Sequence, residues 1–221
     1  MSVWAILVAA GRGERLGLDH PKAFAKLGED PLLAEPLRRL DESEWVDAIV
    51  VVVPAGWEEP AILLAEEVGC GKVNACVAGG SERADSVRAG LAEVAADAVA
   101  VLVHDAARPL VDDDVIGRVL APLSEGWDGV VPGLPVADTL KRVDGDGLVL
   151  ETVGRDAVYA VQTPQAFPAD VLRRALASGD RASDCAGSVE AIGGRVKVVA
   201  GDPRLLKVTT AEDLARIDAW R

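Results

Sequence analysis

Short apolar runs recur along the 221-residue chain, separated by segments in which polar and apolar positions mix. Several runs consist almost wholly of valine, leucine and alanine, which is typical of strands covered on both faces. We predict strands over residues 3–8, 48–53, 73–78, 99–103, 129–132, 158–162 and 195–200.

Amphipathic segments of helical length lie between most of these strands, over residues 32–40, 58–68, 82–95 and 114–123. Ser81 is expected to cap the third predicted helix, and Asp112 or Asp113 the fourth. Strands that alternate with helices favour parallel pairing. The pattern therefore predicts an α/β fold: a mostly parallel, Rossmann-like sheet with helices on both faces.

One segment, residues 136–152, interrupts this alternation with two polar strands around Asp144-Gly145-Asp146-Gly147. Aspartate-glycine pairs favour tight hairpin turns, and an isolated hairpin is marginal in water unless it packs on something. It could fold back on its own domain or reach a second subunit, and we favour the second. We predict a single domain over 1–221, with an inserted dimerisation arm at about 136–155.

Composition agrees with this fold class, because half of the residues are apolar and only 4% are aromatic. The net charge of −13 argues against nucleic-acid binding, which needs clustered lysine and arginine. The three cysteines form no C-x-x-C pair, so we read them as reduced core residues. We find neither a signal peptide nor an apolar run near the ~20 residues of a membrane span, and expect a cytoplasmic protein.

Glycine-rich and charged residues follow the predicted strands, where parallel sheets bind their ligands. Gly11, Gly13 and Gly17 fit neither the G-x-G-x-x-G nor the G-K-S/T phosphate loop. The other groups are Lys22, Gly79-Gly80-Ser81-Glu82-Arg83, His104-Asp105-Ala106-Ala107-Arg108-Pro109, Thr163-Pro164-Gln165 and Lys207-Val208-Thr209. Cations gathered at one edge of an acidic protein predict a multiply phosphorylated ligand.

Asp105 is the carboxylate placed to hold a hard cation, and Mg²⁺ commonly uses one or two carboxylates plus substrate phosphates. His104 we read as a buried, satisfied histidine in preference to a general base. A zinc site and a serine or cysteine nucleophile are disfavoured, because neither the paired ligands nor the G-x-S-x-G elbow is present.

These motifs resemble a known family. The loop Ala9-Ala10-Gly11-x-Gly13-x-Arg15-Leu16, followed by Pro21-Lys22, is similar to the signature of nucleotidyltransferases. Five further motifs narrow the resemblance: Gly79-Gly80-x-x-Arg83-x-x-Ser86-Val87, His104–Pro109, Asp138-Thr139-x-Lys141, Gln162-Thr163-Pro164-Gln165-x-Phe167 and Lys207-Val208-Thr209. Together with the loop, they resemble the 2-C-methyl-D-erythritol 4-phosphate cytidylyltransferases of the non-mevalonate isoprenoid pathway.

The resemblance implies that a substrate phosphate oxygen attacks the α-phosphorus of CTP and that pyrophosphate leaves, with Mg²⁺ or another divalent cation bound at Asp105. It further implies a homodimer formed through the arm, and the following roles. Arg15 and Lys22 would stabilise the transition state. Ala9, Ala10, Gly11, Gly13, Gly80, Ser81 and Ser86 would bind CTP, and Asp105, Arg108, Thr139, Arg155, Thr163 and Lys207 would bind methylerythritol phosphate.

Three alternatives stay open: a ribitol 5-phosphate cytidylyltransferase, a sugar-1-phosphate nucleotidyltransferase, and a non-catalytic nucleotide-binding module. The presence of Arg15, Lys22 and Asp105 together argues against the last. Three places depart from the pattern usual in the family: Ala23-Phe24, Leu205-Leu206 and Asp184-Cys185.

Overall fold

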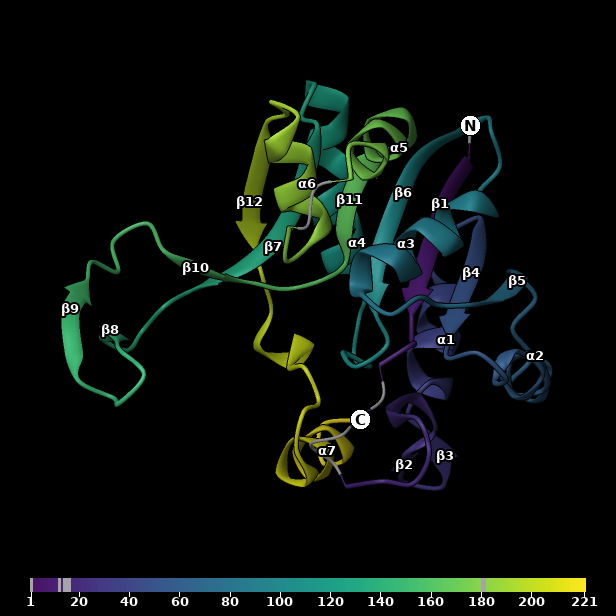
Figure 1. Ribbon diagram of the computed structural model, residues 1–221. Coiled ribbons are helices and arrows are strands. Elements are labelled where there is room, and N and C mark those ends of the chain that lie inside the picture. Colours follow the sequence, from purple (N-terminus) through teal and green to yellow (C-terminus); the bar gives the residue numbers. More distant parts are fainter. Residues whose placement is uncertain (1, 12, 14–16, 180–181) are drawn as a thin grey trace.

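The computed structural model describes residues 2–11, 13, 17–179 and 182–221. Within this part of the chain, a twisted sheet of eight strands is flanked by helices, and one long arm projects from its side (Figure 1). The strand order is β10-β7-β11-β6-β1-β4-β5, and β12 also pairs with β7. The strands are β1 (Ser2–Val8), β4 (Ala48–Val53), β5 (Val73–Ala78), β6 (Ala98–Asp105), β7 (Gly129–Pro135), β10 (Tyr159–Val161), β11 (Gln165–Pro168) and β12 (Val196–Ala200).

The sheet is mostly parallel, as predicted. β1 lies between β4 and β6 and runs parallel to both, with Ile6 opposite Val50 and Val103. β5 is parallel to β4, and β12 is parallel to β7. β10 and β11 are antiparallel to their neighbours, and the sequence did not predict β11, a run of only four residues.

Helices cover both faces of the sheet, which confirms the second part of the fold prediction. Alternate residues of β1 enter two different cores: Ala5 and Leu7 one, Trp4 and Ile6 the other. The helices α1 (Ala34–Glu42), α2 (Glu58–Glu67) and α4 (Asp113–Leu120) pack in the first core. The helices α3 (Arg83–Ala92), α5 (Ala169–Ala177) and α6 (Cys185–Ala191) pack in the second. Burial on both faces explains why the strands are valine-rich and not alternating.

The helix caps were predicted correctly in one case and wrongly in the other. Asp112 caps α4, because its carboxylate accepts a hydrogen bond from Val115 N at 3.0 Å. The cap of α3 is Glu82, not Ser81, and it forms a capping box with Asp85. Ser81 lies one residue outside the helix, where its hydroxyl contacts Asp85 Oδ2 at 3.2 Å.

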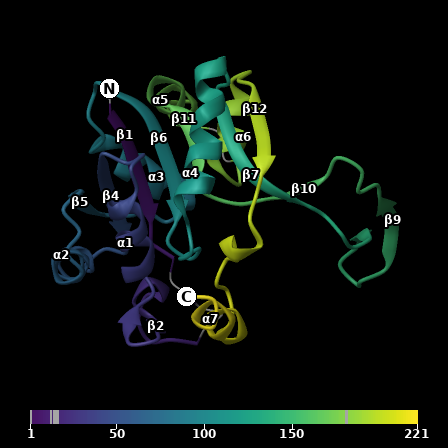
Figure 2. The ribbon, with the colours of Figure 1, turned by 180° about the vertical axis from the view of Figure 1, so that it is seen from behind.

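A small lobe lies below the carboxyl ends of the parallel strands. It combines the short strands β2 (Lys26–Leu27) and β3 (Asp30–Pro31) with the C-terminal helix α7 (Ala211–Asp218), as Figure 2 shows from behind. Leu27, Leu32 and Ile217 share its buried cluster. The lobe carries the short 3₁₀ helix η2 (Lys22–Phe24) on one side and the 3₁₀ helix η4 (Pro203–Leu205) leads into it. Another 3₁₀ turn, η3 (Ala121–Glu125), follows α4.

The predicted hairpin is present as β8 (Leu140–Val143) and β9 (Val149–Val153), which pair antiparallel. Asp144 Oδ1 accepts hydrogen bonds from the main-chain N–H groups of Asp146 and Leu148 and so stabilises the turn. The hairpin does not fold back on its own domain: it extends away from the sheet (Figure 1). Its apolar side chains are consequently uncovered, with Leu148 66% and Leu150 59% exposed.

No helix in the described ranges is both long and apolar enough to cross a bilayer.

Candidate active site

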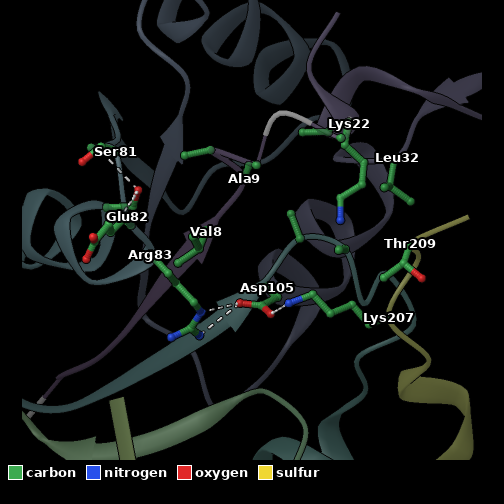
Figure 3. Close-up of a pocket in the computed structure, with 18 residues that line it drawn as sticks. Val8, Ala9, Lys22, Leu32, Ser81, Glu82, Arg83, Asp105, Lys207 and Thr209 are labelled. Carbon is green, nitrogen blue, oxygen red and sulfur yellow. Dashed lines mark hydrogen bonds and ion pairs between the residues drawn. The ribbon is translucent and has the colours of Figure 1, made fainter. Parts of the chain in front are cut away.

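A cleft of about 480 Å³ opens at the carboxyl ends of β1, β5 and β6 (Figure 3). The sheet supplies its floor, and the small lobe supplies the wall that carries Lys22 and Thr209. The predicted residues that line it are Ala9, Ala10, Gly11, Gly13, Lys22, Gly80, Ser81, Ser86, Asp105 and Lys207. The residues that the strand-end argument selected therefore meet in one cleft.

Asp105 is the last residue of β6 and is only 7% exposed. Arg83 holds its Oδ1 with Nε at 3.1 Å and Nη2 at 3.0 Å, and Lys207 Nζ lies 2.6 Å from its Oδ2. Burial alone would raise the pKa of Asp105, but the charges of Arg83 and Lys207 outweigh it and hold that pKa well below its usual range. The group stays a carboxylate, and two cations surround it.

Arg83 is the functional candidate that the sequence did not assign. It is the first residue of α3, and its Nη1 also lies 3.6 Å from the Sγ of Cys185, at the start of α6. Burial raises the pKa of the Cys185 thiol, so the thiol stays protonated beside the guanidinium. The glycine motif already contained Arg83, but its pairing with Asp105 depends on how α3 and β6 meet in the fold.

The glycines after β5 bring two loops into close contact. A Cβ on Gly79 would lie 2.6 Å from Ala10 Cβ and 2.7 Å from Ser86 Oγ, so a side chain there would push β1's loop away from α3. Gly80 N donates to Ser86 Oγ at 3.2 Å, and Ser86 is buried. This packing leaves main-chain groups on the cleft surface, where a nucleotide could be bound closely.

Lys22 points into the cleft from the small lobe (Figure 3). Its Nζ donates to the carbonyl oxygen of Val208 at 3.0 Å. Gly13 packs against it with φ +72°, and a Cβ there would lie 2.7 Å from Lys22 Cβ. Arg15, the other predicted catalytic residue, lies outside the described residues.

Four predicted substrate-binding residues do not line the cleft. Thr163 is 4% exposed and sits behind Asp105, whose main-chain N–H donates to its Oγ1 at 3.0 Å. Arg108 donates from Nη1 to the Leu205 carbonyl at 2.6 Å, and its buried Nε has no partner among the described residues. Thr139 and Arg155 are exposed on the arm, and Arg155 donates to the carbonyl of Ala137.

An open, mostly parallel sheet with cations and carboxylates converging at its strand ends is typical of an α/β enzyme that acts on a phosphorylated ligand, such as a nucleotidyltransferase. The comparison with known families narrows this. The sequence profile of the IspD family, described as 2-C-methyl-D-erythritol 4-phosphate cytidylyltransferase, matches residues 3–220. The chain belongs to this family and is a cytidylyltransferase.

Individual relatives support the same family assignment. The chain is 50% identical over 213 residues to a 2-C-methyl-D-erythritol 4-phosphate cytidylyltransferase of Nocardia farcinica, covering 96% of this chain and 91% of the relative. It is 49% identical over 223 residues to one of Saccharopolyspora erythraea, covering 99% of both chains. A crystal structure of the Thermus thermophilus enzyme superposes with a TM-score of 0.81 at 33% identity, covering 100% of this chain and 98% of that one.

Proposed function

We propose that this chain transfers CMP from CTP to 2-C-methyl-D-erythritol 4-phosphate in the cleft between the sheet and the small lobe. An oxygen of the acceptor phosphate bonds to the α-phosphorus, the bond from that phosphorus to the β-phosphate oxygen breaks, and pyrophosphate leaves. The observation that carries the proposal is the placement of Asp105 between Arg83 and Lys207, in the same cleft as Lys22.

Charge is the main requirement of this reaction, because two anions meet at the α-phosphorus. The attacking phosphate is already ionised, so positioning and charge neutralisation matter more than proton transfer. Lys22 and Lys207 both supply cations to the cleft, in a protein of net charge −13. Lys22, with Arg15 by the family resemblance, is proposed to stabilise the five-coordinate phosphorus.

Magnesium is proposed to enter with the nucleotide. The described residues contain no group of three or more His, Cys, Asp or Glu side chains that could hold a metal ion, which disfavours a site made of protein alone. One carboxylate, Asp105, fits the way Mg²⁺ binds in nucleotide sites, with phosphate oxygens and water completing its shell. Asp105 would hold the ion, and the ion would neutralise charge on the triphosphate.

The acceptor is proposed to bind through Arg108 and Lys207. The buried Nε of Arg108 is a donor without a partner in the described chain, and a phosphate oxygen would satisfy it. The CTP contacts of Ala9, Ala10, Gly11, Gly13, Gly80, Ser81 and Ser86 are part of the same proposal. For Thr163, which is buried behind Asp105, we propose an effect on substrate binding through Asp105.

A homodimer formed through the arm completes the proposal. Thr139 and Arg155 are exposed on the arm and do not line the cleft of their own chain, and Leu148 and Leu150 are uncovered on the same arm. Docking of the arm on a second copy would bury these leucines and could bring Thr139 and Arg155 to the partner's cleft. A cytoplasmic location is also proposed, and the three free thiols agree with a reducing compartment.

The test is pyrophosphate release with CTP and Mg²⁺, comparing methylerythritol phosphate with ribitol 5-phosphate as acceptor. The proposal predicts release with methylerythritol phosphate alone. Release with ribitol 5-phosphate alone would contradict the assigned acceptor and leave the nucleotide chemistry standing. Release with neither would overturn the proposed function.

A further inference from the structure

Directly behind the cleft, His104 and Thr163 form a buried polar pair. His104 precedes Asp105 on β6 and is 0% exposed. Its Nδ1 lies 3.1 Å from Thr163 Oγ1, and its Nε2 lies 3.0 Å from the carbonyl oxygen of Arg108. The same Thr163 oxygen accepts the main-chain N–H of Asp105 at 3.0 Å. One imidazole thus connects to both Asp105 and Arg108.

The chemistry of the partners fixes where the protons are. A carbonyl oxygen can only accept, so Nε2 of His104 carries the hydrogen that reaches Arg108. The buried Thr163 oxygen already accepts the Asp105 N–H, and its own hydrogen needs an acceptor, which Nδ1 at 3.1 Å supplies, so Nδ1 carries no hydrogen. The Thr163 hydroxyl therefore donates to Nδ1 while it accepts from Asp105. The donor and the acceptor are therefore defined for each hydrogen bond of this network.

The network also includes the turn that carries the side chains of Asp105 and Arg108. Arg108 N donates to the Asp105 carbonyl at 2.9 Å, and the Arg108 guanidinium is held by Leu205. Because the Thr163 hydroxyl is already used in both directions, it has no second hydrogen to give to a substrate. Its position suits an indirect role through Asp105.

We infer that His104 is a positioning residue for cytidylyl transfer. It holds Asp105 through Thr163, and it holds Arg108 through its own Nε2–H. The inference rests on the proposed function for its catalytic consequence, but the proton arrangement can be measured on the free protein. His104 is too deeply buried to touch a substrate and is not a general base.

The first experiment is nitrogen NMR of histidine-labelled protein without ligands. We expect His104 to be a single Nε2–H tautomer at neutral pH. An Nδ1–H tautomer, or an imidazole that averages between tautomers, would overturn the inference whatever the enzyme's activity.

The second experiment separates the two hydrogen bonds of the His104 ring with two amide variants. His104→Asn can keep an acceptor near the Nδ1 position but cannot reach Arg108. His104→Gln can keep a donor near the Nε2 position but removes the acceptor for Thr163. We expect His104→Asn to raise the KM for the acceptor roughly tenfold, and His104→Gln to raise the Mg²⁺ concentration for half-maximal turnover by a similar factor, since small misplacements are costly at reacting groups.

Rescue and control variants decide between positioning and mere stability. Thr163→Ser should keep both constants within about twofold of wild type, whereas Thr163→Val should behave like His104→Gln. Leu172→Ala, a buried α5 substitution in the second core, should lower Tm without changing either constant. If the His104 variants lower Tm and leave both constants unchanged, the inference is wrong. Absence of pyrophosphate release by the wild type would instead refute the proposed function.

Discussion

Lys22 Nζ donates a hydrogen bond to the main-chain carbonyl of Val208, 186 residues further along the chain. Val208 N in turn donates to the Ala107 carbonyl at 2.8 Å. These two bonds join the segment after the glycine loop, the Asp105–Arg108 turn and the segment that carries Lys207. The segments that carry Lys22, Arg108 and Lys207 are therefore held together by hydrogen bonds. Fixed positions of this kind are the preorganisation that charge stabilisation requires.

Lys22→Ala should bind CTP nearly as well as wild type but lose turnover. A contact that acts mainly on the developing charge contributes to kcat, and its removal typically costs about 10²–10³ in rate. Calorimetry with CTP and a pyrophosphate assay measure the two quantities. Lys26→Ala, an exposed lysine on β2, is the matched control. Full turnover in Lys22→Ala would remove the transition-state assignment; the same pair of measurements applies to Arg15→Ala.

Asp105→Asn should abolish the stimulation of turnover by Mg²⁺ and also lower stability. The neutral amide leaves Arg83 and Lys207 close together without a carboxylate between them. Breaking a buried pair typically costs roughly 3–5 kcal/mol, and we expect about 2 kcal/mol because the Lys207 side chain is partly exposed. Denaturant unfolding and a Mg²⁺ titration of turnover measure these effects. Asp170→Asn, on the surface of α5, should change neither, and an Asp105→Asn enzyme with normal Mg²⁺ dependence would contradict the metal assignment.

Gly79→Ala should weaken CTP binding more than it lowers stability. The new methyl group would meet Ala10 and Ser86 at 2.6 and 2.7 Å, so the two loops must separate at the predicted nucleotide surface. Calorimetry should show at least roughly tenfold weaker CTP binding, since a site assembled within tenths of an ångström is sensitive to such shifts. Gly71→Ala, where a Cβ meets nothing within 4 Å, is the control. Unchanged CTP affinity in Gly79→Ala would place the nucleotide elsewhere.

Leu148→Asp combined with Leu150→Asp should convert a dimer into a monomer with little turnover. Both leucines are exposed on the arm, and a charge at each would oppose burial in a subunit interface. Light scattering gives the mass, and the pyrophosphate assay gives the activity. Leu63→Asp on α2, 57% exposed, is the control and should remain dimeric. A fully active monomer would show that the arm has no part in the mechanism.

Asp213→Asn should reduce stability at neutral pH but not in acid. The Thr209 hydroxyl, with the Thr209 and Thr210 N–H groups, lowers the pKa of Asp213 to about 2. A carboxylate whose pKa falls on folding stabilises the protein above its unfolded pKa of about 3.9, and this contribution disappears as the pH falls toward 2. The Tm difference between variant and wild type should therefore shrink between about pH 4 and 2. A difference that stays constant over that range would contradict the assignment.

The sequence predicted those parts of the fold that depend on local patterns. Valine-rich runs identified β1, β4 and β6, and aspartate-glycine pairs identified the β8–β9 hairpin, because burial on two faces and turn geometry both act over a few residues. β11 and the helices α5 to α7 were missed: β11 and α6 are short, whereas α5 and α7 are clearly amphipathic and the prediction did not consider them. The Ser81 cap was wrong by one residue because Glu82 and Asp85 form a reciprocal box that the prediction did not consider.

The candidate site was predictable in location but not in its contacts. Parallel topology alone placed Gly11, Gly80 and Asp105 at one edge of the sheet. The pairing of Arg83 with Asp105, and the burial of Thr163 behind it, depend on how the start of α3 and the β10–β11 loop approach the end of β6. Such long-range contacts leave no periodic signal in the sequence.

The central claim, that an acceptor phosphate oxygen attacks the α-phosphorus of CTP in this cleft, can be tested by isotope tracing. Methylerythritol phosphate labelled with heavy oxygen in its phosphate would be converted with unlabelled CTP, and the product followed by phosphorus NMR. The account predicts heavy oxygen in the bridge between the two phosphorus atoms of the product and none in the pyrophosphate. An unlabelled bridge, or label in the pyrophosphate, would contradict it.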